Sequence, residues 1–198
     1  VTKIRIMEGR LLILISLKTG DLLLVKKAQN KLSEMIIRGT KQTFLDRPLA
    51  YYHIGIVEKE GTDFFVLHAT KDHGCIRQPL DQFISEEGLI DVYRKSSPLI
   101  NPLKILKRAK SMLEAPYNPS FRLDQPGYYC SDYVVNAFKD ENIFHLSPMV
   151  FGPNGSVLPE WQQYYENLDL PVPNGQLGSS PNSLISQGHL KFIGAINS

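Results

Sequence analysis

The chain has 198 residues, of which 42% are hydrophobic and 21% are charged. This length and composition predict one domain, residues 1–198, built around its own hydrophobic core. Basic residues number 22 and acidic residues 20, so the net charge of +2 creates no strong field toward nucleic acid or an anionic membrane surface. We therefore expect no nucleic-acid partner. The two cysteines, Cys75 and Cys130, are too few for a disulfide framework.

The first marked feature is the apolar run from Leu11 to Leu17, which follows basic residues as the hydrophobic part of a signal peptide does. It lacks a small-residue cleavage site and is far too short to span a bilayer. We interpret it as a buried strand or helix end, and we expect no integral membrane segment. Because the chain begins at Val1 and not at Met, a preceding targeting segment and the compartment are left open.

Periodicity and turn residues predict the other elements in chain order. A turn at Thr19 to Asp21 precedes a buried strand, Leu22 to Val25, and a helix then follows from Ala28 to its end near Gly39. Further predicted elements are strands at Cys75 to Gln78, Leu89 to Arg94 and Leu190 to Ile196, a helical turn at Leu80 to Ile84, and a helix capped by Asn101 and Pro102.

Two runs typical of strands, Tyr51 to Glu58 and Asp63 to Thr70, predict a hairpin. If it turns symmetrically about Glu60 and Gly61, His53 lies directly opposite His68, with Cβ atoms about 4.5–5.5 Å apart. Gly55 would leave open space beside them. Two such histidines suit a base and the group that orients it. A loop one residue longer would send His68 to the other face. A separate alternative is that the two histidines are ordinary half-buried polar residues of a strand pair.

Other polar residues near this hairpin support weaker alternatives. Glu58 and Asp63 could orient His53 instead, although both lie farther along the strands. The set His68, His73 and Cys75 matches no zinc-binding spacing. We therefore expect neither a metal nor a cofactor.

The stretch from Pro116 to Phe138 delivers Cys130 to the start of a predicted helix with one apolar face. Unpaired backbone N–H groups and the helix dipole at that position favour a thiolate, the form a nucleophilic cysteine needs. The alternative is that Cys130 is a small buried hydrophobic residue.

Residues 147–189 are rich in proline and glycine and show periodicity only around Trp161 to Tyr165. We predict a long loop region over or near the cleft, because long loops inside compact domains are usually functional. Its aromatic side chains either line that cleft or anchor the loop on the core.

Assembled, these residues resemble the permuted YiiX/YebB-like branch of the NlpC-type, papain-like cysteine peptidase superfamily. In non-permuted members the cysteine motif precedes the histidine strand, whereas here His53 precedes Cys130. The motifs that carry the resemblance are Thr19-Gly20-Asp21-Leu22-Leu23, His53-Ile54-Gly55-Ile56-Val57, Val66-Leu67-His68-Ala69-Thr70, Ala115-Pro116-Tyr117 and Tyr129-Cys130-Ser131-Asp132.

The resemblance implies an α+β, circularly permuted papain-like fold, with an antiparallel sheet or small barrel packed against helices. It implies that Cys130 is the nucleophile, His53 the general base and His68 the residue that orients it. Tyr117 would help to stabilise an oxyanion, or would be a packed cleft aromatic. Tyr129 departs from the pattern, because many cell-wall enzymes carry an aspartate there.

The implied activity is that of a cysteine hydrolase that cleaves an amide bond through a thioacyl-enzyme intermediate. Its expected substrate is a small peptide, a peptidoglycan-derived murein fragment or another acyl-amide, and its expected location is a bacterial cell envelope or periplasm. One alternative is a lipid acyltransferase or phospholipase resembling the lecithin retinol acyltransferase relatives, which often carry two histidines and a cysteine. A second alternative is a binding module without catalysis.

Overall fold

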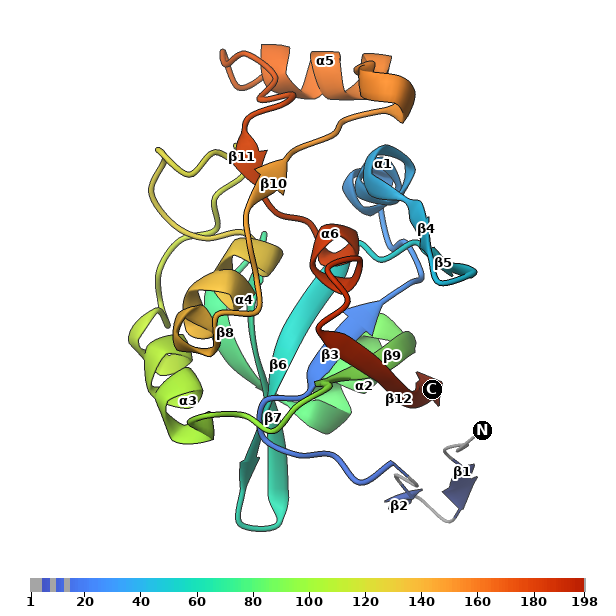
Figure 1. Ribbon diagram of the computed structural model, residues 1–198, viewed down its shortest axis with the longest axis vertical. Helices are drawn as coiled ribbons and strands as arrows, with labels where there is room; N and C mark the ends of the chain where they lie inside the picture. Colours follow the sequence, from blue (N-terminus) through green and yellow to red (C-terminus); the bar gives the residue numbers. More distant parts are fainter. Residues whose placement is uncertain (1–4, 8–9, 13–14, 198) are drawn as a thin grey trace.

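A computed structural model describes residues 5–7, 10–12 and 15–197. Its centre is a six-stranded sheet in which all neighbouring strands are antiparallel (Figure 1). The strand order is β12 (Leu190–Asn197), β9 (Leu89–Lys95), β3 (Leu22–Val25), β6 (His53–Glu60), β7 (Asp63–Thr70) and β8 (Gly74–Pro79). The predicted antiparallel sheet packed against helices is confirmed.

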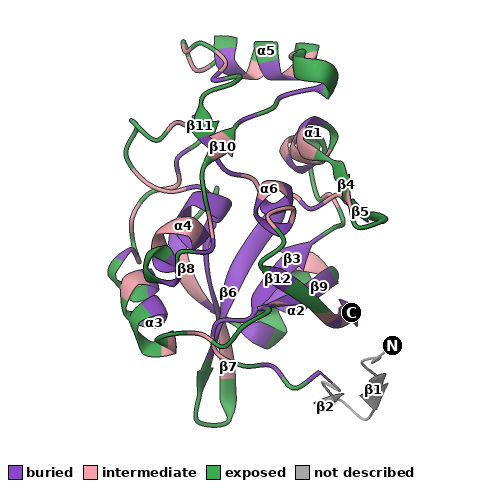
Figure 2. Ribbon diagram, viewed as in Figure 1, coloured by how far each residue is buried: buried purple, intermediate pink, exposed green. Residues whose placement is uncertain are grey.

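Helices cover both faces of this sheet. Side chains alternate between the faces of a strand, so Leu22 and Leu24 join one apolar core while Leu23 and Val25 join the other. The first core receives α3 (Pro102–Ser111) and α4 (Cys130–Ala137), and the second receives α2 (Leu80–Glu87). Burial on both faces explains the uninterrupted apolar sequence of β3, and the central strands are correspondingly buried in Figure 2.

A third apolar cluster lies beyond the end of the sheet, between α1 (Lys31–Thr40) and α5 (Pro159–Glu166). Segment 147–189 also contains the strand pair β10 (Ser147–Pro148) and β11 (Leu177–Gly178), as well as α6 (Pro181–Ile185). The prediction of one long loop did not include β10, β11 and α6, whereas α5 contains the one stretch, Trp161 to Tyr165, in which the sequence is periodic. The remaining elements are β1 (Arg5–Met7), β2 (Arg10–Leu12), β4 (Gln42–Phe44), β5 (Arg47–Leu49), and the 3₁₀ turns η1 (Lys139–Glu141) and η2 (Pro153–Gly155).

Most other predicted elements are confirmed, and their local chemistry explains them. Asn101 caps α3 by accepting a hydrogen bond from the backbone N–H of Lys104 at 3.0 Å, with Pro102 in the first turn. The prediction for Leu11 to Leu17 includes residues 13 and 14, which lie outside the described residues. In the described part of the chain no helix is long and apolar enough to cross a membrane.

The register of the β6–β7 hairpin corrects one prediction. The pairs run from Glu60 and Asp63 to Ile56 and Leu67, two residues out of the predicted register. The prediction that His53 directly faces His68 is therefore wrong. A shift of two residues keeps both side chains on the same face, whereas a shift of one would have separated them.

The space predicted beside Gly55 is also absent, which is a second correction. A Cβ atom at Gly55 would lie 2.5 Å from Val66 Cγ1 and 3.3 Å from His68 Cβ. The missing side chain thus allows β7 to approach β6 closely. This close approach brings His68 toward the start of β6.

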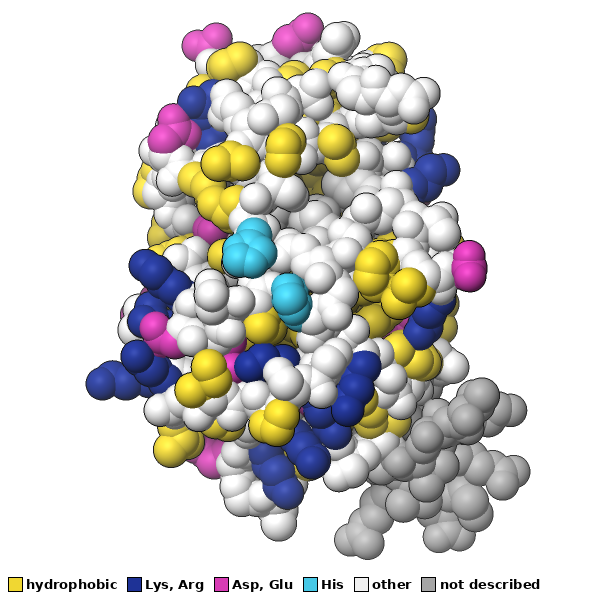
Figure 3. All heavy atoms as spheres, viewed as in Figure 1, with side chains coloured by type: hydrophobic (Ala, Val, Ile, Leu, Met, Phe, Trp, Pro, Cys, Tyr) yellow, Lys and Arg dark blue, Asp and Glu magenta, His cyan; other side chains and the backbone are white. Residues whose placement is uncertain are grey.

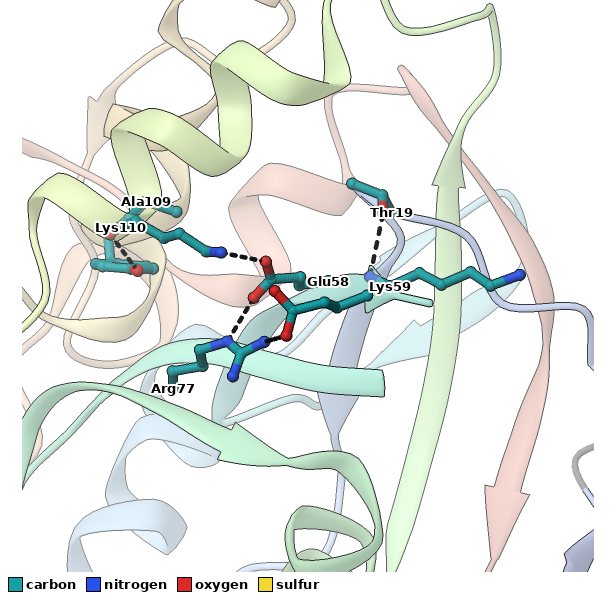
Figure 4. A network of polar contacts seen from close by, with 8 residues as sticks. Thr19, Glu58, Lys59, Arg77, Ala109 and Lys110 are labelled. Carbon is teal, nitrogen blue, oxygen red and sulfur yellow. Dashed lines mark hydrogen bonds and ion pairs between the residues drawn. The ribbon is translucent and has the colours of Figure 1, made fainter. Parts of the chain in front are cut away.

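Glu58 joins the hairpin to its neighbours on the face that α3 covers (Figure 4). Its buried carboxylate accepts a hydrogen bond from Arg77 Nε at 2.7 Å and pairs with Lys110 of α3. Arg77 also reaches the exposed Glu60. Glu58 is therefore engaged away from His53, and Asp63 lies exposed at the hairpin tip, so neither orients that histidine.

Candidate active site

Cys130 is the first residue of α4, as predicted, and Tyr129 before it is extended. The apolar side chains of α4, including Tyr133 and Val134, pack against the sheet and hold the helix start beside β6. The Cys130 Sγ atom lies 3.9 Å from the carbonyl oxygen of Tyr52. It also receives a hydrogen bond from the backbone N–H of Ile54. The thiol therefore lies against the backbone on both sides of His53.

The environment keeps this thiol protonated at neutral pH. Burial raises the pKa of Cys130 to about 12, although hydrogen bonds from the backbone N–H groups of Ile54 and Ser131 act in the opposite direction. This differs from the expected resting thiolate. The helix terminus does favour the charged form, but removal of water from the thiol outweighs it.

The structure brings His53 and His68 into direct contact. His53 Nε2 lies 2.8 Å from His68 Nδ1, and both rings pack against Phe83 of α2. Burial lowers the pKa of His53 to about 4. Burial and the neighbouring His53 lower the pKa of His68 to about 3. Both imidazoles are therefore neutral at pH 7.

The thiol and the His53 ring approach the start of β6 from different sides of the sheet. The ring leaves toward α2, whereas α4 covers the opposite face. The β6–β7 ladder ends at Ile56, whereas His53 remains paired with Val25 of β3. Within the described residues, Sγ makes hydrogen bonds with the backbone of Tyr52 and Ile54, and none with the His53 ring.

Tyr117 and Tyr129 lie close to the thiol. Burial and then the nearby Cys130 raise the pKa of Tyr117 well above its ordinary value, so its hydroxyl is a neutral donor. Tyr117 packs edge-to-face on Phe121, with ring centroids 6.3 Å apart. The Tyr129 hydroxyl accepts a hydrogen bond from the backbone N–H of Ser179 at 3.2 Å. Tyr129 thus fixes the chain that passes beside the thiol.

A cavity of about 350 Å³ begins at Cys130 and extends between α1 and α5. Neither His53 nor Tyr117 lines it. Serines supply part of its polar wall, including Ser131 and Ser179. Segment 147–189 contributes to the lining, as does α1. The apolar part of the wall is formed by Ile36, Phe121, Met149, Val150, Phe151 and Trp161.

Sequence reasoning missed two polar residues behind the histidines. His68 Nε2 lies 3.0 Å from Gln78 Oε1, and Gln78 Nε2 donates to Glu86 Oε2 at 2.8 Å. The strand pairing of β7 and β8 places Gln78 on the same face as His68. That pairing could have been anticipated from the short turn between the strands.

The other cysteine and histidines lie away from this site. Cys75 is buried in the core under α4, and burial raises its pKa to about 12. His73, His145 and His189 are exposed. Surface hydrophobic side chains are scattered over the face drawn in Figure 3, with Lys and Arg mostly in its lower half. Apolar side chains gather beside the thiol, in the cavity wall.

The order of these elements, a histidine strand before a cysteine helix, agrees with comparisons to known proteins. Residues 16–194 match the family of permuted papain-like amidase enzymes, YaeF/YiiX, C92. The chain belongs to this family and is a papain-like cysteine hydrolase of the amidase and peptidase class.

A particular structural relative is the crystal structure described as that of the metalloprotein yiiX from Escherichia coli O157:H7, DUF1105. The TM-score is 0.68 with 20% sequence identity, over 89% of this chain and 96% of that chain. This likeness supports the permuted papain-like fold. No curated protein matches the chain. Among the described residues here, no three His, Cys, Asp or Glu side chains gather to hold a metal ion.

Proposed function

We propose that this protein hydrolyses an amide bond with Cys130 as nucleophile and His53 as general base. The observation that carries the proposal is the position of the Cys130 thiol: it lies against the backbone that flanks His53, at one end of a cavity. The other cysteine, Cys75, is enclosed in the core. His68 holds the far nitrogen of the base through the 2.8 Å contact and orients the ring.

The reaction starts from a neutral pair. His53 Nδ1 takes the thiol proton as Sγ attacks the carbonyl carbon, which gives a tetrahedral oxyanion. Collapse breaks the C–N bond, and the imidazolium returns its proton to the departing amine. Water then attacks the thioester, again with His53 as base, and releases the carboxylic acid and the free thiol.

The oxyanion requires hydrogen-bond donors that are already in place. Backbone N–H groups at the first turn of α4 are free of helical partners and lie beside Sγ. The hydroxyl of Tyr117, which is neutral and close to Cys130, is a further candidate donor. We assign these groups the stabilising role.

The residues that line the cavity indicate which class of substrate would fit it. A small peptide or another acyl-amide fits a family of amidases, and a murein fragment is one such substrate. The apolar wall and the position of Tyr129 beside Cys130 favour an uncharged, apolar acyl portion over a charged murein peptide. A second candidate is therefore a thiol enzyme that cleaves or transfers a lipid acyl group.

The proposal is tested with the whole chain and two substrate panels, murein peptides and long-chain acyl amides or esters. Mass spectrometry after rapid quenching should find the acyl group on Cys130. Cys130→Ala should abolish hydrolysis, and His53→Ala should lower kcat/KM by about 10²–10⁴-fold. Tyr117→Phe should lower kcat with little change in KM.

Cys75→Ala and the exposed His73→Ala are the matched controls and should keep wild-type activity. Hydrolysis that survives in Cys130→Ala would refute the assigned nucleophile. Turnover confined to the lipid panel would select the second candidate over the first. Loss of activity in the controls to the same extent as in the site variants would also contradict the assignment.

A further inference from the structure

We propose that Gln78 and Glu86 are positioning residues that determine which nitrogen of His53 carries its proton. This inference rests on the proposed role of His53 as the base. The four side chains form one continuous series: Glu86 accepts from Gln78 at 2.8 Å, Gln78 contacts His68 at 3.0 Å, and His68 contacts His53 at 2.8 Å. Each contact limits the donor and acceptor choices of the next.

The series begins at the Glu86 carboxylate, which acts only as a hydrogen-bond acceptor. The hydrogen bond from Gln78, followed by that from Gln82, lowers the pKa of Glu86, so its carboxylate stays ionised and can only accept. Gln78 must therefore direct its NH₂ group toward Glu86. Its carbonyl oxygen, a pure acceptor, then faces His68 Nε2.

The protonation of both histidines follows from that orientation. His68 Nε2 must carry the hydrogen, because Gln78 Oε1 cannot donate. Neutral His68 then has a lone pair on Nδ1, so His53 Nε2 must donate to it. His53 Nδ1 is consequently the unprotonated nitrogen. This is the nitrogen that the proposed general base needs in its unprotonated form.

Burial of the polar contacts strengthens their control over which nitrogens of His53 and His68 are protonated. His68 and Gln78 are 2% and 6% exposed, so water cannot readily replace either contact. The opposite orientation of the Gln78 amide would set two acceptors, Gln78 Oε1 and the Glu86 carboxylate, against each other. The carboxylate end is different: Glu86 is exposed on α2, where Gln82 Nε2 also donates to it at 2.9 Å.

The test is ¹⁵N NMR of histidine-labelled protein at pH 7, combined with kinetics. In the wild type, His53 and His68 should each be protonated at Nε2 and unprotonated at Nδ1. Gln78→Leu removes the amide at similar volume, so both rings should exchange between tautomers. Its kcat should fall about 5- to 30-fold, as expected for a lost buried hydrogen bond, with KM unchanged.

Glu86→Ala is the second variant, because an exposed site tolerates substitution if Gln78→Leu fails to fold. It frees the Gln78 amide to flip and should also mix the tautomers. Glu86→Gln, which keeps an acceptor for Gln78, should restore the wild-type spectrum. Gln82→Ala is the matched control: Gln82 donates to the same carboxylate without touching a histidine, and the spectrum should not change.

Wild-type tautomers in both Gln78→Leu and Glu86→Ala would overturn the positioning role, as would protonation of His53 at Nδ1 in the wild type. These spectra are recorded without substrate. Failure of the catalytic assignment would instead appear as activity in Cys130→Ala, so the two failures can be told apart.

Discussion

Acidification should destabilise this protein through its two buried neutral histidines. The ordinary pKa of histidine is 6.5, and burial lowers the pKa of His53 to about 4 and that of His68 to about 3. Between these values and pH 6.5 the unfolded chain binds protons that the folded chain excludes. The stabilisation is therefore complete above pH 6.5 and is lost as the pH falls toward 4.

The size of the effect follows from the same values. Each pH unit below 6.5 removes about 1.4 kcal/mol of unfolding free energy for each histidine, until the folded pKa is reached. At pH 5 the loss is roughly 2 kcal/mol for His53 and a similar amount for His68. Together this is a large share of the 5–15 kcal/mol that typically holds a domain folded.

Urea denaturation at a series of pH values between 7 and 5 measures this loss. Carboxylates also titrate in acid, so the informative quantity is the difference between variants. His68→Gln should lose about 2 kcal/mol less than the wild type over this range. His73→Gln, which changes an exposed histidine, should follow the wild type. An equal loss in His68→Gln and the wild type would refute the reasoning.

Two further predictions concern the hairpin that carries His53. Glu58→Gln should lower the unfolding free energy by about 1–3 kcal/mol in chemical denaturation, because it leaves Arg77 without its buried partner. Glu60→Gln, at the exposed end of the same arginine, should change the unfolding free energy little. Equal effects of the two substitutions would contradict the assigned difference in burial. Gly55→Ala should lower the unfolding free energy by about 1–3 kcal/mol and displace His68, because the added Cβ overlaps side chains of β7. Chemical denaturation and the imidazole NMR signals measure the two effects. Unchanged stability and an unchanged spectrum would show that β7 does not require a glycine at position 55.

Local sequence patterns were sufficient for the sheet and for most helices. The strand β3 is apolar throughout because both of its faces are covered, and α3 begins at an asparagine followed by proline. Patterns were insufficient where packing decides the outcome. The hairpin turns at Gly61 and Thr62, one residue later than the symmetric turn that we predicted, and this moved the register by two.

In the candidate site, too, local sequence patterns predicted some features and packing decided others. The types of residue identified Cys130, His53 and His68, and the structure places the two histidines in contact. The protonation state of Cys130 was not predictable, because burial of the thiol depends on chain segments distant in sequence. Gln78 and Glu86 were missed for a related reason: each lacks chemistry of its own and becomes informative only beside His68.

The order of the two site segments also has a consequence for biosynthesis. The ribosome releases β6 and its histidine before α4, so a nascent chain carries His53 before it carries Cys130. Strand β12 is added last, beside β9. The proposed catalytic pair of a growing polypeptide therefore remains incomplete until α4 has been made.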